Sequence, residues 1–248
     1  MISKAKIKYI HSLEQKKTRK EEKVFVAEGP KVVGDLIETM PPVSLFATEE
    51  WLRAHPQHGD LCQVVTEDEL QKLSFLQHPQ QVLAVFPQFD NTPTFHPDTL
   101  SLALDGVQDP GNLGTIIRIA DWFGIEDIYC SKDTADIYNP KVVQATMGSM
   151  ARVKVQYTDL PSFIGSLPEG YPMYGTLLDG EDIYQQALTS YGLIIMGNEG
   201  NGISPDIRQR VNHRLLIPNF PEGRKTADSL NVAIATAIIC AEFRRRSS

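Results

Sequence analysis

The chain has 248 residues, of which 42% are hydrophobic and 22% are charged, a composition typical of soluble globular proteins. No stretch approaches the roughly 20 apolar residues that a membrane span needs, and the N-terminus lacks the apolar core of a signal peptide. Cys62, Cys130 and Cys240 lie far apart and match no metal-ligand spacing. We therefore expect a cytoplasmic protein with reduced cysteines, no membrane segment and no metal site.

The net charge of -7 conceals a basic N-terminal segment. Residues 1–23 hold eight of the 24 Lys and Arg residues and only three Glu, and Arg244, Arg245 and Arg246 follow near the C-terminus. A polyanion is attracted by a local patch rather than by the total charge, so this distribution permits RNA as a partner. Solvated helix faces are the alternative explanation.

Residues 1–90 show the alternation of helices and strands that is typical of a small α/β module. Helices are predicted at 6–17, 32–39 and 69–75, and strands at 23–27, 43–48, 62–65 and 81–86. The proline-rich segment 87–100 has no apolar periodicity and indicates a linker at 91–99.

Residues 100–248 alternate more regularly and form the second predicted domain. Short apolar strands are predicted at 102–106, 127–130, 153–157, 173–178, 193–197 and 214–218. Helices are predicted at 112–124, which Gly124 ends, and after the pairs Asn139-Pro140 and Ser204-Pro205. This alternation implies a mostly parallel sheet covered on both faces. The last helix, 230–243, is apolar nearly all round, so we expect it to be buried in the domain or in a subunit interface.

Four polar, glycine-rich loops follow the strands of this sheet, at 105–114, 178–182, 197–204 and 218–231. Ligands of parallel α/β sheets gather beyond the carboxyl ends of the strands, so these loops are the expected site.

The loop 197–204 reads GNEGNGIS, and its glycines let a ligand approach the backbone closely. The spacing matches neither of the common phosphate-binding loops, and Glu199 would repel a phosphate. A carboxylate suits a cationic or hydroxyl-rich ligand better, such as the sulfonium of S-adenosylmethionine. A glycine-rich surface turn is the alternative.

The loop 105–114 leads into a helix that Asn112 is expected to cap. Arg118 lies six residues on, between apolar neighbours, and is interpreted either as a clamp for a phosphate or as half of a structural ion pair. Ser229 is expected to cap the last helix, and Asn231 follows it. Together with Glu199, these side chains could line one polar pocket.

Three segments in this order, 109–124, 193–204 and 215–238, resemble the motifs of the SpoU (TrmH-type) ribose methyltransferases of the SPOUT superfamily. The resemblance covers residues 100–246, and segment 25–38 also resembles the N-terminal substrate-binding domain of that family. It implies an RNA substrate-binding domain at 1–90 and a methyltransferase domain at 100–248, with a parallel sheet and a deep trefoil knot.

The resemblance further implies a homodimer whose active site is completed across the interface, with S-adenosylmethionine held in the knot. It implies catalytic roles for Arg118, Asn112, Glu199, Ser229 and Asn231. The cofactor-binding residues that it implies are Thr176, Leu177, Leu178, Met196, Gly197, Asn198, Gly200, Leu216, Ile217, Pro218, Ser229 and Leu230.

The implied reaction is methyl transfer from S-adenosylmethionine to a ribose 2′-hydroxyl of RNA. The separate basic module favours ribosomal over transfer RNA, and a non-catalytic RNA-binding protein of the same fold is a further alternative. Because a guanidinium resists deprotonation, we expect Arg118 to bind a phosphate and orient the hydroxyl rather than act as a base. The loop 218–228 looks about four residues longer than is usual for the family, and we hypothesise that Arg224 and Lys225 within it touch RNA.

Overall fold

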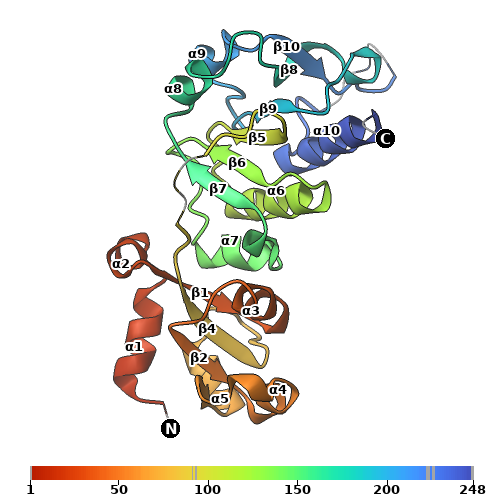
Figure 1. The fold of residues 1–248 in the computed structure, drawn as a ribbon. Helices are drawn as coiled ribbons and strands as arrows, with labels where there is room; N and C mark the ends of the chain where they lie inside the picture. The colour runs from red at the N-terminus through yellow and green to blue at the C-terminus, as the bar shows by residue number, and fades with distance from the viewer. Residues whose placement is uncertain (1, 91, 93, 222–223, 225–226, 247–248) are drawn as a thin grey trace. The chain divides into compact units, whose positions relative to one another are not determined.

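The computed structural model describes residues 2–90, 92, 94–221, 224 and 227–246 (Figure 1). The chain forms two units, Met1–Asp90 with Asp136–Ala151, and Asn91–Ala135 with Arg152–Ser248. The segment Asp136–Ala151 therefore groups with the first unit, although its position in the sequence places it in the second predicted domain.

The first unit is built on a four-stranded sheet in the order β1-β4-β2-β3. Its strands are β1 (Val24–Glu28), β2 (Ser44–Ala47), β3 (Cys62–Val64) and β4 (Val82–Pro87). Strands β1 and β2 run antiparallel to β4, and β3 runs parallel to β2. The helices are α1 (Lys4–Ser12), α2 (Lys16–Glu22), α3 (Pro30–Ile37), α4 (Glu49–Ala54), η1 (Pro56–His58), α5 (Glu67–Leu73), α7 (Pro140–Ala145) and η2 (Ser149–Ala151).

The single helix predicted at 6–17 is two helices, because the chain turns after Leu13. The buried guanidinium of Arg19 donates hydrogen bonds to the carbonyl oxygens of Leu13 and Glu14, at 2.9 and 2.6 Å. It also forms an ion pair with Asp136 at 2.7 Å. One buried side chain thus satisfies the carbonyl groups that the end of α1 leaves free.

The second unit contains a six-stranded sheet in the order β10-β8-β9-β5-β6-β7, and every pairing between its strands is parallel. Its strands are β5 (Leu100–Leu104), β6 (Asp127–Cys130), β7 (Lys154–Tyr157), β8 (Met173–Asp182), β9 (Gly192–Met196) and β10 (His213–Leu216). The helices are α6 (Pro110–Trp122), α8 (Leu160–Gly165), η3 (Ile183–Gln185), α9 (Pro205–Arg208) and α10 (Val232–Arg246). The central strands β5 and β9 are buried throughout, as expected for a sheet covered on both faces.

Two helix caps predicted from the sequence are wrong. Helix α6 is capped by Asp109, whose side chain accepts a hydrogen bond from the Asn112 N–H at 2.7 Å. Helix α10 begins at Val232, and the Asn231 side chain accepts hydrogen bonds from the N–H groups of Ala233 and Ile234. A cap must reach donors two or three residues along the chain, which Asp109 and Asn231 do. Asn112 is therefore free to point its amide elsewhere.

Helix α10 packs beside α6 (Figure 1), and the C-terminal end of α10 contacts η3. Glu242 is only 6% exposed and accepts hydrogen bonds from Arg245 and Arg246, and Arg246 donates to the carbonyl oxygens of Ile183 and Gln186. These two arginines lower the pKa of Glu242 to about 2.

The described residues contain no helix long and apolar enough to cross a membrane. They also contain no group of three or more His, Cys, Asp or Glu side chains that could hold a metal ion. Cys130 and Cys240 are buried free thiols, and burial raises the pKa of both.

Candidate active site

Residues 176–179 of β8, the end of β10 with Ile217, the loop after β9, residues 228–230 and the start of α10 meet around a pocket of about 590 Å³ in the second unit. Eleven of the twelve residues predicted to bind a cofactor line it, and the exposed Pro218 does not. The complete lining is Thr176, Leu177, Leu178, Asp179, Met196, Gly197, Asn198, Glu199, Gly200, Asn201, Gly202, Ile203, Arg208, Leu215, Leu216, Ile217, Asp228, Ser229, Leu230, Val232, Ala235 and Ile239.

The lining includes residues that the sequence analysis does not name. Val232, Ala235 and Ile239 follow one another at helical spacing on α10, a signal that places them on one face of that helix. Asp179 and Arg208 form an ion pair with each other, and Arg214 lies 3.4 Å from the same carboxylate. No local pattern in the sequence links these three residues.

The pocket combines an apolar interior with charged groups at its rim. Met196 and Leu215 are each 2% exposed, and Leu177 is 8% exposed. Glu199 and Asp228, in contrast, are exposed carboxylates. Such a lining can hold a molecule with a flat apolar part and a polar, positively charged part.

The loop after β9 depends on Gly197 and Asn198. A Cβ atom on Gly197 would lie 2.3 Å from the carbonyl carbon of Gly202, so only glycine allows this close approach. Asn198 and Gly202 pair through two backbone hydrogen bonds of 3.0 and 2.9 Å. The Asn198 side chain accepts from the N–H groups of Gly200 and Asn201 and donates to the Gly106 carbonyl oxygen at 2.6 Å. This side chain therefore shapes the loop from within.

Three of the predicted catalytic residues form one hydrogen-bonded chain. The Asn112 amide donates to a Glu199 carboxylate oxygen at 3.0 Å, and the Asn231 amide donates to the Asn112 carbonyl oxygen at 2.9 Å. The Gln108 N–H lies 3.5 Å from the second Glu199 oxygen. The first turn of α6, the loop after β9 and the residue before α10 are thus joined beside the pocket, and Asn112 is the link between Glu199 and Asn231.

Arg118 is exposed on α6, and within the described part of the chain it makes no hydrogen bond or ion pair. The described residues therefore give no support to the alternative of a structural ion pair. Arg118 lies six positions after Asn112 on the helix, a rise of about 9 Å along the helix axis. The guanidinium is available for a ligand, and the residues described within one chain do not join it to the Glu199 network.

Two further predictions concern the loop ends. Ser229 lines the pocket but does not cap α10, since the cap is Asn231, two residues later. Arg224 is exposed, and its N–H donates to the Pro221 carbonyl oxygen at 3.2 Å. Lys225 lies outside the described residues.

Comparison with known proteins agrees with this arrangement. The model of the SpoU rRNA Methylase family matches residues 99–241, and that of the MRM3-like substrate binding domain matches residues 4–84. The chain is 32% identical, over 96% of both chains, to the 23S rRNA (guanosine(2553)-2′-O)-methyltransferase RlmP of Bacillus subtilis.

Solved structures are similar over nearly the whole chain. An AdoMet-bound rRNA methyltransferase from Sinorhizobium meliloti is 32% identical, with a TM-score of 0.87 over 99% of this chain and 96% of the other. A TrmH-family structure from Porphyromonas gingivalis is 39% identical, with a TM-score of 0.88 over 99% of both chains. The six-stranded parallel sheet and its cluster of loops are thus the fold of a SPOUT-type methyltransferase. The chain belongs to the SpoU rRNA methylase family.

Proposed function

We propose that this chain transfers the methyl group of S-adenosylmethionine to a ribose 2′-hydroxyl of ribosomal RNA. The observation that carries the proposal is the chain of hydrogen bonds from Glu199 through Asn112 to Asn231, beside a pocket large enough for the cofactor. The similarity to RlmP over 96% of both chains supports ribosomal RNA as the substrate.

The residues around the pocket fit S-adenosylmethionine. The buried side chains of Leu177, Met196 and Leu215 suit the adenine ring, and the open backbone at Gly197 lets the ligand approach the loop. The exposed carboxylate of Glu199 favours the positive charge of the sulfonium. The bound cofactor supplies an electrophilic methyl group. Residues 176–178, 196–200, 216–217 and 229–230, which line the pocket, hold the cofactor in this proposal.

The protein's contribution to the reaction is mainly positional. Methyl transfer is an in-line displacement, which gains most from aligning the hydroxyl with the methyl group. Arg118 binds the phosphate beside the reacting ribose and orients the hydroxyl, because its planar guanidinium suits a phosphate and does not give up its proton. The hydroxyl proton leaves to water. Glu199, Ser229 and Asn231 shape the pocket around the ribose, and Asn112 fixes the Glu199 carboxylate.

The C-terminal segment of the second unit forms a trefoil knot in this proposal. Residues 228–230 and the first turns of α10 lie near residues 176–179 of β8 and the loop after β9, since all three segments line the same pocket. The register of β10 on β8 also shifts between Arg214 and Leu215. A Cβ on Gly180 would lie 2.6 Å from the Leu215 carbonyl carbon, so the paired strands β8 and β10 are in close contact at this irregularity. Threading of the C-terminal chain between these segments accounts for that proximity.

The functional form is a homodimer. Trp122 at the end of α6 is 85% exposed, and Ile234 on the adjacent helix α10 is 53% exposed. Large apolar side chains so exposed on two packed helices mark a protein interface. Arg118 lies one turn before Trp122, so in a dimer it can complete the active site of the partner.

The first unit binds the RNA in this proposal, with domains at 1–90 and 100–248 and a linker at 91–99. The exposed lysines Lys4, Lys8, Lys16, Lys17 and Lys20 on α1 and α2 supply positive charge for the phosphate backbone. Arg224 and Lys225 give a second basic contact with the RNA in this proposal. Ribosomal RNA as the substrate places the protein in the cytoplasm.

Mapping of 2′-O-methyl sites tests the proposal. RNA is isolated from cells with the gene, cells without it, and cells without it that carry a wild-type copy. We expect the loss of one methylated ribose in ribosomal RNA and its return with the copy. Loss of a transfer RNA site instead would contradict the substrate, and an unchanged methylation map would contradict the activity.

A further inference from the structure

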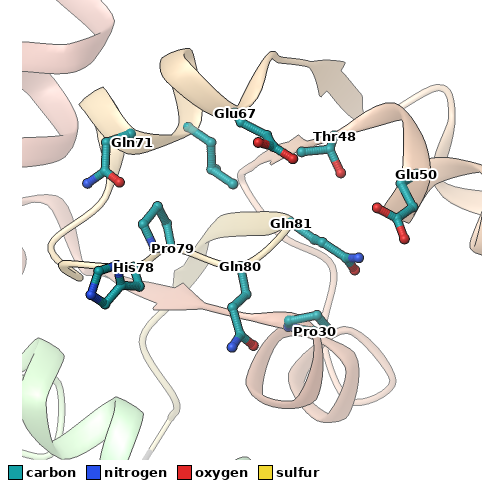
Figure 2. Close-up of a pocket in the computed structure, with 10 residues that line it drawn as sticks. Pro30, Thr48, Glu50, Glu67, Gln71, His78, Pro79, Gln80 and Gln81 are labelled. Carbon is teal, nitrogen blue, oxygen red and sulfur yellow. The ribbon is translucent and has the colours of Figure 1, made fainter.

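The first unit contains a second hollow, of about 540 Å³, which the reaction above does not use. It lies between α5 and the turn 76–81 that leads into β4, with the beginnings of α3 and α4 at one side (Figure 2). Its volume falls within the range of roughly 300–1,000 Å³ that is usual for small-ligand sites. The lining residues are Pro30, Thr48, Glu50, Glu67, Leu70, Gln71, His78, Pro79, Gln80 and Gln81.

The chemistry of the lining disfavours a phosphate group inside the hollow. None of the described residues around the hollow is Lys or Arg, and Glu50 and Glu67 bring two carboxylates to one side of it (Figure 2). Three glutamine amides, which both donate and accept hydrogen bonds, contribute to the remaining polar surface together with Thr48 and His78. A neutral molecule that carries several N–H groups is the ligand that this surface favours.

Three polar side chains at the hollow have no hydrogen-bond partner among the described residues, although the backbone that bears two of them is fixed. Within the described residues, the side chains of His78, Gln80 and Gln81 make no hydrogen bond. The backbone beneath them is fixed, since the Thr48 N–H donates to the Gln81 carbonyl oxygen at 2.8 Å and the Gly29 N–H donates to the Val82 carbonyl oxygen at 2.9 Å. An anchored turn therefore presents free amides to the hollow.

Gln81 adopts a backbone conformation that usually belongs to glycine. Its φ angle is 52°, in the left-handed region that costs a side-chain-bearing residue free energy. Glycine would fit this position without strain. Strained positions of this kind cluster at sites where the side chain is needed for function. The amide of Gln81 is thus placed at the hollow at the expense of stability.

We propose that this hollow binds an unpaired nucleobase of the RNA substrate, one that carries an exocyclic amino group. The inference rests on the proposed function. It adds to the reaction site a second binding site, on the first unit, that helps to select the RNA. Glu50 and Glu67 accept hydrogen bonds from the amino group, as carboxylates do with cytosine, and the amides of Gln80 and Gln81 bind the remaining polar edge. The rings of His78 and Pro79 offer flat faces against which the base can stack.

Binding of short single-stranded RNA to the full-length protein tests the proposal. Labelled oligonucleotides of equal length made only of C, only of A or only of U carry the same number of phosphates, so backbone binding contributes nearly equally to all three. We expect the C and A oligonucleotides to bind at least about fivefold more tightly than the U oligonucleotide, since uracil has no amino group. Equal affinity for all three would overturn the proposal.

Two variants test whether the side chains at the hollow bind the base or only support the fold. Gln81→Gly should lower affinity for the C oligonucleotide at least about threefold, while Tm stays the same or rises because strain is relieved. The double variant Glu50→Gln and Glu67→Gln should reduce the preference over U. Gln77→Ala, in the same turn but outside the lining, is the matched control and should bind as wild type does. Unchanged binding by Gln81→Gly would refute the role of the turn.

Methyl transfer by the same samples distinguishes the two proposals. A wild-type protein that methylates ribosomal RNA but shows no base preference would leave the reaction standing and remove the subsite. A wild-type protein that discriminates among the oligonucleotides but methylates no RNA would support the subsite and contradict the reaction.

Discussion

Replacement of Asn112 by Ala tests the hydrogen-bonded chain at the mouth of the pocket. The substitution removes the 3.0 Å bond that Asn112 donates to Glu199 and the 2.9 Å bond that it accepts from Asn231. A hydrogen bond to a charged acceptor contributes about 1.5–3 kcal/mol and a neutral one about 0.5–1.5 kcal/mol. Because both partners are exposed, we take the lower part of these ranges, a total of about 2 kcal/mol.

A loss of about 2 kcal/mol of transition-state stabilisation corresponds to a roughly thirtyfold fall in kcat/KM. The assay is the transfer of tritiated methyl groups from S-adenosylmethionine to ribosomal RNA purified from cells that lack the gene. Asp109→Ala is the matched control, because it removes the cap of the same helix, at a stability cost of about 1 kcal/mol, without touching Glu199.

Each outcome of this comparison has a distinct meaning. We expect Asn112→Ala to lose activity with a small change in Tm, and Asp109→Ala to lower Tm and keep most activity. Equal losses of activity in the two variants would mean that the start of α6, rather than the amide link, matters. Activity of Asn112→Ala within about threefold of wild type would refute a functional role for the chain of hydrogen bonds.

Three further outcomes are expected. Arg118→Ala should lose most methyl transfer yet bind S-adenosylmethionine normally by calorimetry; an active variant would remove Arg118 from the mechanism. Gly197→Ala should abolish cofactor binding, because the added methyl would overlap Gly202, and full affinity in calorimetry would contradict the proposed site. The pKa of Glu242 is lowered to about 2, so its carboxylate contributes stability that is fully present above about pH 4.5 and is lost as the pH falls toward 2. Glu242→Gln should therefore cost about 1–2 kcal/mol at neutral pH in denaturant titrations and little near pH 2, and a cost independent of pH would argue against this ion pair.

The local elements follow closely from the sequence, because apolar periodicity and turn residues act over short distances. Strand β6 has the predicted bounds, and Asn139 caps α7 with Pro140 at its first position. The six-residue helices α4 and α8 were not predicted, since they are too short to show a helical period. The strand order of the second sheet could not be derived either, because pairing depends on contacts between residues far apart in the chain.

In the candidate site, too, local features could be predicted from the sequence and contacts between distant residues could not. The loops that contribute to the pocket could be named from their glycines and polar residues, but the partners within it could not. Asn112 and Asn231 are 119 positions apart and meet through one hydrogen bond. The choice of cap was ambiguous because Asp109 and Asn112 are both good capping residues, and only Pro110 at the first helical position favours Asp109. Local patterns therefore identify the chemistry available, and the tertiary fold decides which groups meet.

The discontinuity of the first unit limits how the protein can be divided. A fragment that ends at residue 90 would lack Asp136, so the buried guanidinium of Arg19 would lose its ionic partner, a loss that typically costs about 3–5 kcal/mol. It would also lack α7, which packs on β1. Expression of the N-terminal segment alone should thus give a poorly folded product, and gene fusion or domain exchange at residue 91 would not transfer an intact first unit.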